Sequence, residues 1–181
     1  MVITKCRIPG LLIIEPRVFE DERGSFFESF NEDQFRELTG VDLTFCQDNE
    51  SISKKNVLRG LHFQVNPFAQ GKLVRVVRGK VLDVAVDLRK DSTFYGQHEL
   101  IELSAENKKQ FWIPPGFAHG FLTMEENSIF NYKCTNYYSP FAEGTIQWDD
   151  KDLAINWSID EPIVSEKDQN GEKFSNFVSQ F

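Results

Sequence analysis

The chain has 181 residues, of which 40% are hydrophobic, and its formal net charge is −8 at pH 7. This length and apolar content favour one folded domain, residues 1–181, and argue against disorder. The acidic balance argues against nucleic acid as the main partner, because binding to phosphate backbones needs a basic surface. A local cluster of cations can still bind a small anionic ligand.

The sequence also indicates a cellular compartment. The opening segment MVITKCRIPG lacks the apolar centre of a secretion signal, and no apolar run approaches the roughly 18 residues of a membrane span. Cys6, Cys46 and Cys134 lie far apart without a Cys-x-x-Cys spacing and are predicted to be buried free thiols. We therefore expect a cytoplasmic protein that does not bind membranes.

Short strands dominate the predicted elements of the first third of the chain. In chain order these are a strand over 10–16 that ends at Pro16, a turn over 21–24, a strand over 25–30 and a helix over 34–38. Asn31 or Asp33 is suited to cap that helix, and Gly40 is suited to close it.

The centre of the chain predicts a β-hairpin. Strand patterns over 72–77 and 81–88 flank Arg78-Gly79-Lys80, with glycine at the turn. In the second strand, alternation places Asp83 and Asp87 on one face with small residues. Two interpretations stay open at this point: a partly polar interior, or acids that point outward into solvent.

The last part of the chain continues the β pattern. Strands are predicted over 111–113, 117–122 and 128–135, and the polar tail from Ser165 is either helical or loose. Closely spaced strands with Gly and Pro turns, together with 17 phenylalanines, indicate a mainly β sandwich or barrel.

The most informative segment is Leu58–Gln64, in which Arg59 and His62 flank Gly60. Residues three apart on a regular strand point to opposite faces, but a bend or bulge at the glycine can turn both into one cavity. Histidine, with an ordinary pKa of about 6.5, suits proton transfer, and arginine suits phosphate binding. The pair predicts chemistry on a phosphorylated small molecule. The alternative is a hydrogen-bonded histidine beside a surface arginine.

The spacing of glycines, prolines and histidines resembles that of the cupins, which are double-stranded β-helix (jelly-roll) proteins that often bind a metal. Such sites usually have two histidines one residue apart, a nearby glutamate and a distant third histidine. Here Gln64 stands where the second histidine would be, and residues 65–71 contain no carboxylate. His98 is predicted to be exposed, and His62 with His119 does not make a three-ligand site. We predict a mainly β, cupin-like barrel with a few short helices and without a metal.

Without a metal, side chains must perform the chemistry, and the candidates are His62, Lys72, Asp83, His119 and Tyr132. An imidazole and a phenol make a base and an acid, and a lysine can stabilise negative charge on an oxygen. This set suits removal of a proton beside a carbonyl and its return from the other face. The alternatives are a core tyrosine and a strand-edge lysine.

Several segments, in this order and spacing, closely resemble the dTDP-4-dehydrorhamnose 3,5-epimerase family over about residues 10–168. They are 21–28 (DERGSFFE), 47–49 (QDN), 51–64 (ending VLRGLHFQ), 70–76 (QGKLVRV), 79–89 (GKVLDVAVDLR), 113–121 (IPPGFAHGF), 132–140 (YKCTNYYSP) and 165–168 (SEKD).

The resemblance implies an isomerase that acts on a dTDP-4-keto-6-deoxyhexose and inverts C3 and C5, both next to the C4 ketone. It implies no metal, no organic cofactor, and a homodimer that exchanges N-terminal strands. The implied catalytic residues are His62 as base, Asp168 as its orienting carboxylate, Tyr132 as acid, Lys72 near the C4 oxygen, and His119 in the same pocket.

The resemblance also implies a set of substrate contacts. They are Arg23 and Arg59 to the diphosphate, Gln47, Asn49 and Glu28 to the nucleotide or sugar, Tyr138 to thymine, Phe26 to the base from the other subunit, and Glu143 and Lys167 to the substrate. Two alternative functions stay open: an enzyme of the same fold that inverts C3 only or moves the ketone, and a non-catalytic sugar-nucleotide binding module. A metal-dependent cupin oxygenase is disfavoured because the metal ligands are missing.

Overall fold

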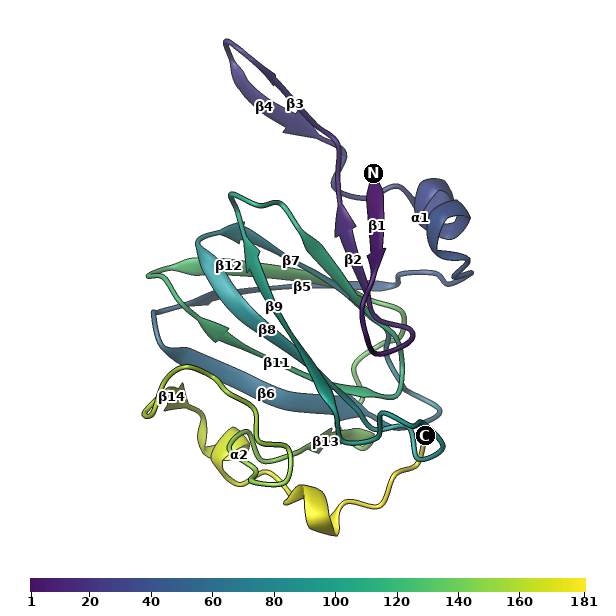
Figure 1. Ribbon diagram of the computed structural model, residues 1–181, viewed down its shortest axis with the longest axis vertical. Helices are drawn as coiled ribbons and strands as arrows, with labels where there is room; N and C mark the ends of the chain where they lie inside the picture. The colour runs from purple at the N-terminus through teal and green to yellow at the C-terminus, as the bar shows by residue number, and fades with distance from the viewer.

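Two antiparallel sheets form the body of the protein in the computed structural model, which describes residues 1–181 (Figure 1). The first sheet has the order β1-β2-β10-β7-β12-β5. Its strands are β1 (Val2–Lys5), β2 (Leu12–Glu15), β10 (Gln110–Ile113), β7 (Lys72–Arg78), β12 (Ser128–Cys134) and β5 (Gln47–Ser53).

The second sheet has the order β13-β6-β11-β8-β9, and β14 pairs with β6 in parallel. Its strands are β13 (Glu143–Thr145), β6 (Val57–Gln64), β11 (Phe117–Thr123), β8 (Lys80–Asp87), β9 (His98–Ser104) and β14 (Ile163–Val164). The remaining elements are the hairpin of β3 (Val18–Asp21) and β4 (Gly24–Phe27), the helices α1 (Glu32–Thr39) and α2 (Glu166–Gln169), and the 3-10 turn η1 (Phe174–Asn176).

The predicted hairpin over 72–88 is wrong, because β7 and β8 lie in different sheets. β7 pairs with β10 and β12, whereas β8 pairs with β9 and β11. The chain crosses between the sheets at Gly79, whose φ of +77° is accessible to glycine. Val76 and Val81 then pack in the same core cluster between the sheets instead of sharing backbone hydrogen bonds. Alternating apolar residues around a glycine fit both a hairpin and such a crossing.

This crossing recurs along the chain, since β5 and β6 also lie in opposite sheets, as do β10 and β11. The resulting architecture is a double-stranded β-helix, and the predicted mainly β, jelly-roll class is confirmed.

Three apolar clusters stabilise the fold. The first lies between the sheets and includes Phe111, Phe121 and Phe130. The second covers the outer face of the second sheet, where the C-terminal segment packs through Trp157. The third joins α1 to the outer face of the first sheet through Phe35. Apolar packing thus covers both outer faces of the barrel. Polar residues instead gather in the space between the sheets, at one end of the barrel.

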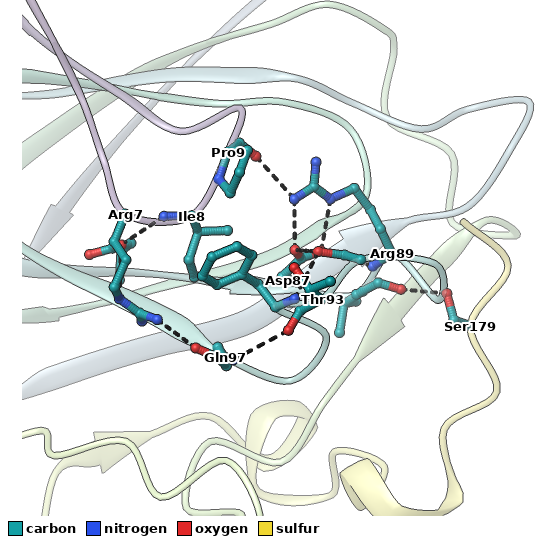
Figure 2. A network of polar contacts seen from close by, with 12 residues as sticks. Arg7, Ile8, Pro9, Asp87, Arg89, Thr93, Gln97 and Ser179 are labelled. Atoms are coloured by element: carbon teal, nitrogen blue, oxygen red, sulfur yellow. Dashed lines mark hydrogen bonds and ion pairs between the residues drawn. The ribbon is translucent and has the colours of Figure 1, made fainter.

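Both aspartates of β8 are fully buried, so the interpretation as solvated outward acids is wrong. Asp83 lies near the functional pocket described below. Asp87 accepts hydrogen bonds from Arg89 at 2.6 and 2.8 Å and from the Ser92 hydroxyl at 2.6 Å. Arg89 also donates to the Pro9 carbonyl, and Ser179 donates to the Leu88 carbonyl (Figure 2). This network ties both ends of the chain to the β8–β9 connection.

The helix prediction is confirmed: the Asn31 side chain caps α1, and Gly40 closes it. The strand predicted over 25–30 ends at Phe27, and the tail forms the short α2.

Of the cysteines, all of which are free, only Cys134 is buried; the other two are half-buried. His98, predicted to be exposed, is half-buried at the start of β9. No helix is both long and apolar enough to cross a membrane.

Candidate functional site

A polar cavity of about 250 Å³ opens at one end of the barrel, between the two sheets. Its walls come from β5, β7 and β12 of the first sheet and from β6 and β13 of the second. The lining residues are Gln47, Asn49, His62, Phe63, Gln64, Gln70, Lys72, Tyr132, Tyr138 and Glu143. Seven of them belong to the set predicted from the sequence, so the fold brings together residues up to 96 positions apart.

A bulge in β6 aims His62 into this space. Leu58 and Leu61 both pack in the outer cluster under the C-terminal segment, although residues three apart normally face opposite ways. The register with β11 shifts between the pairs His62–His119 and Arg59–Phe121, which adds one residue to β6 at Gly60. Arg59 and His62 therefore point to the same inner side, and the bend expected at this glycine is confirmed.

Substitution Gly60→Ala is expected to lower the free energy of unfolding by about 3 kcal/mol or more, through backbone strain combined with overpacking. Gly60 has a φ of +131°, and an added Cβ would lie 2.5 Å from the Cα of Gly120. Gly24→Ala is the matched control, because its φ is +120° but nothing lies within 4 Å of the added atom. Urea denaturation of both variants measures the difference; equal losses would contradict the proposed close approach of β6 and β11.

His62 forms a short hydrogen bond with a carboxylate from the far end of the chain. Its Nε2 lies 2.7 Å from Oδ1 of Asp168, whose side chain is only 4% exposed. Burial raises the pKa of Asp168, but the hydrogen bond and charge of His62 and the Gly60 amide outweigh it, so the net pKa lies below the ordinary value. The ionised carboxylate is suited to accept a hydrogen bond from Nε2–H, and in the neutral imidazole with that tautomer Nδ1 is the ring nitrogen without a proton.

Asp168 is positioned by its local structure. Ser165 caps α2 by accepting a hydrogen bond from the Asp168 amide, and β14 fixes the preceding residues against β6. The pairing of His62 and Asp168 across 106 positions therefore depends on the C-terminal segment packing on the barrel.

Behind the cavity lies a second buried histidine–aspartate pair. His119 Nε2 lies 3.0 Å from Oδ2 of Asp83, and the imidazole stacks on Phe130. Lys72, only 9% exposed, lines the cavity nearby. Burial lowers the pKa of the Lys72 ammonium, against the opposing effects of Cys134, Asp83 and Glu143. These groups make the interior partly polar, as one interpretation of the sequence predicted.

Tyr132 lines the cavity from the first sheet, whereas His62 lines it from the second. Burial raises the pKa of the Tyr132 phenol, and Arg59 opposes this rise only in part. Tyr132 therefore carries its proton at neutral pH and can donate it. The two residues present a base and an acid to the cavity from different sheets.

The cavity mouth is rimmed by hydrogen-bonded polar residues. The Tyr138 hydroxyl donates to Glu143 Oε2 at 2.9 Å, and Lys167 forms an ion pair of 2.5 Å with the same carboxylate. Burial raises the pKa of Glu143, but the bonds from Lys167 and Tyr138 outweigh it and the net shift is downward. Gln47 and Asn49 are hydrogen-bonded to each other on β5.

Four predicted contacts lie away from the cavity within this chain. Arg59 is exposed and donates to the Ser53 hydroxyl. Arg23 and Phe26 lie on the β3–β4 hairpin, which projects from the body (Figure 1), and Glu28 follows it and accepts a hydrogen bond from Gln34. A single chain therefore does not unite the hairpin residues with His62 and Tyr132.

Sequence reasoning missed three of the lining residues: Phe63, Gln64 and Gln70. The sequence pattern marks Gln64 only as the residue in place of a metal ligand. The alternation of β6 could have flagged it, since it lies two positions after His62 on the same face. The chain brings together no group of three His, Cys, Asp or Glu side chains that could hold a metal ion.

The jelly-roll barrel and its polar cavity are typical of a cupin-like enzyme, and the cavity contains side chains suited to acid–base chemistry. A sequence model of the dTDP-4-dehydrorhamnose 3,5-epimerase family matches residues 5–176. The chain is 58% identical over 169 residues to a dTDP-4-dehydrorhamnose 3,5-epimerase of Salmonella typhimurium, covering 93% of this chain and 92% of that one. The chain therefore belongs to the dTDP-4-dehydrorhamnose 3,5-epimerase family.

Solved structures agree with this assignment. A dTDP-6-deoxy-D-glucose-3,5-epimerase from Legionella pneumophila in complex with dTDP-4-keto-L-rhamnose is 47% identical, with a TM-score of 0.94 over 98% of this chain and 94% of that one. A 3'-monoepimerase from Streptomyces bikiniensis in complex with dTDP-quinovose is also similar, at 32% identity and a TM-score of 0.90, covering 94% of this chain and 87% of that one. The fold is thus shared by enzymes with one and with two inversions.

Proposed function

We propose that this chain converts dTDP-4-dehydro-6-deoxy-D-glucose into dTDP-4-dehydro-L-rhamnose by inverting C3 and C5. The observation that carries the proposal is that His62, on one sheet and hydrogen-bonded to Asp168 of α2, shares one cavity with a protonated Tyr132 on the other sheet. Both carbons are adjacent to the C4 ketone, which makes their protons acidic. A base and an acid on opposite sides of a planar intermediate are what an inversion needs.

In the proposed reaction, the free ring nitrogen of His62 removes the proton from C3 or C5, and the C–H electron pair moves toward the ketone to form an enolate. Asp168 stabilises the imidazolium that results. Tyr132 then gives its phenolic proton to the same carbon from the other face. Solvent takes the proton from His62 and returns one to Tyr132, so the cycle closes with no net change.

Lys72 is proposed to stabilise the oxygen of the enolate. Its ammonium group is buried at the cavity wall, where a charge interaction is stronger than in water. His119, hydrogen-bonded to Asp83 behind the cavity, is proposed to support the same pocket from behind its wall. Because substrate and product are isomers, the reaction needs no redox partner, and we propose no metal or organic cofactor.

The cavity volume of about 250 Å³ lies below the roughly 300 to 1,000 Å³ typical of ligand pockets. This size supports binding of the sugar inside and of the nucleotide across the mouth. We propose that Tyr138 stacks on thymine, that Gln47, Asn49, Glu143 and Lys167 contact the nucleotide or sugar, and that Arg59 binds the diphosphate. The free thiols support the cytoplasm as the place of action.

We further propose that a second copy of this chain completes the site, through exchanged N-terminal strands. Phe26 is 69% exposed and the Arg23 side chain 84%, on a hairpin that leaves the body of its own chain (Figure 1). Exposed aromatic and arginine side chains are typical of interfaces. The partner's hairpin would bring Arg23, Phe26 and Glu28 to the nucleotide at the cavity mouth.

Co-expression of His62→Ala with Arg23→Ala is expected to restore activity that neither variant has alone. If the two chains pair at random in a two-fold dimer, about half of the dimers are mixed. Each mixed dimer has one complete site, with His62 from one chain and Arg23 from the other, so about a quarter of the wild-type activity is expected. Ultracentrifugation of each variant checks that both form dimers. Activity of the mixture equal to the sum of the separate variants would contradict a site shared between chains.

A second candidate is inversion at C3 only, which the similarity to a 3'-monoepimerase favours. Incubation with dTDP-4-dehydro-6-deoxy-D-glucose in D₂O, coupled to a reductase that traps the product, separates the two. We expect one deuterium at C3 and one at C5. Deuterium at C3 alone would support the monoepimerase, and no incorporation would support a non-catalytic binding module.

A further inference from the structure

The segment between β12 and β13, residues 136–139, has no neighbouring strand to satisfy its main chain. It carries Tyr138, whose ring stands at the cavity mouth. Unpaired main-chain groups away from water cost free energy, so the partners of this segment decide how firmly it is held. Those partners are largely side chains that also line the cavity.

Gln64 makes three of these hydrogen bonds. Its Nε2 donates to the carbonyls of Tyr137 at 3.2 Å and Phe68 at 2.7 Å, and its Oε1 accepts from the Ser139 amide at 2.7 Å. The side chain is only 6% exposed, so these bonds are shielded from water. Gln64 therefore clamps the residues on both sides of Tyr138 and ties them to the β6–β7 connection.

Two further glutamines complete the frame. Gln47 accepts a hydrogen bond from the amide of Tyr138 itself, at 2.9 Å. Gln70 donates to the Asn136 carbonyl at 2.8 Å. Each of the three amides thus faces the cavity on one side and holds residues 136–139 on the other. A glutamine amide offers the two N–H donors and the acceptor oxygen that Gln64 uses here.

We propose that Gln64 is a positioning residue, which acts on nucleotide binding by fixing the backbone on both sides of Tyr138. This inference rests on the proposed function, since the ligand that Tyr138 meets is the nucleotide. The base-binding ring is then held in place before the ligand arrives, which reduces the entropy lost on binding. The proton-transfer residues His62 and Tyr132 are not partners of Gln64, so the chemical step does not depend on it.

The test is a double-mutant cycle on dTDP binding, measured by titration calorimetry for the wild type, Gln64→Met, Tyr138→Ala and the double variant. Gln64→Met is expected to raise the Kd of dTDP about tenfold, because three buried hydrogen bonds are lost. In the Tyr138→Ala background the same change is expected to raise it less than about twofold. With the full substrate, Gln64→Met is expected to raise KM and leave kcat within about twofold.

Gln180→Met is the matched control, because Gln180 is exposed near the C-terminus, and it is expected to bind dTDP like the wild type. If Gln64→Met does not fold, Gln70→Met replaces it in the double-mutant cycle, because Gln70 is only half-buried. Its effect on the Kd of dTDP is likewise expected to be smaller in the Tyr138→Ala background. Additive effects on Kd, or a fall in kcat without a change in KM, would overturn the positioning role alone. Failure of the wild type to bind dTDP would overturn the proposed function and this inference together.

Discussion

His62→Ala is expected to abolish the exchange of substrate hydrogens with solvent deuterium and to lower kcat by about 10² to 10⁴. The variant removes the imidazole that we propose as the base at C3 and C5. The imidazole is 31% exposed, and its removal leaves the other residues of the cavity wall in place. The variant is therefore expected to fold and to bind the nucleotide. NMR of the substrate in D₂O follows the exchange, and calorimetry with dTDP reports binding.

Two further variants sharpen this result. Asp168→Asn keeps the shape of the partner but removes its negative charge, and is expected to leave slow, measurable exchange. His98→Ala tests a half-buried histidine on β9 that does not line the cavity, and is expected to exchange at the wild-type rate. Exchange by His62→Ala near the wild-type rate would remove His62 from the role of base.

Tyr132→Phe is expected to lower the rate of epimerisation by about 10² or more, with the larger defect at C5. The substitution deletes one hydroxyl from a residue whose ring packs against the core cluster between the sheets, so the cavity wall is retained. Removal of the proton by His62 continues, but its return from the other face is slow. NMR of the trapped product measures the inversion at each carbon.

Tyr95→Phe is the matched control, because Tyr95 packs on Phe174 away from the cavity and is expected to keep full activity. An unchanged rate and stereochemistry in Tyr132→Phe would mean that another group supplies the proton. Loss of inversion at C5 with inversion at C3 retained would agree with Tyr132 as the acid and identify C5 as the more dependent carbon.

Local patterns in the sequence predicted much of the fold. The cap at Asn31, the stop at Gly40 and the alternation along β12 depend on neighbours in the chain, so composition and spacing suffice. The partner of β7 could not be predicted in this way, because a crossing between sheets and a hairpin use the same alternation and the same glycine. Long-range pairing, which decides between them, leaves no local pattern.

The residues of the candidate site also fall into two groups: those that local sequence patterns indicate and those that only long-range contacts bring together. Gly60 predicted the bend in β6, because a glycine inside a strand is a local signal for a bulge. The bend turns His62 into the cavity, whereas Arg59 lies outside it. The bond between His62 and Asp168 spans 106 positions, and only the family resemblance indicated it. The sequence indicated Gln64 only as the residue in the position of a metal ligand. Its contacts with residues 136–139 arise from tertiary packing and could not be predicted locally.

The most direct test of the proposed mechanism is a crystal structure of this protein with a dTDP-hexose bound. The proposed mechanism predicts the pyranose ring inside the cavity, with the His62 imidazole on one face and the Tyr132 hydroxyl on the other, each within about 3.5 Å of C3 or C5. Both groups on the same face of the ring, or a hexose outside the space between them, would contradict it.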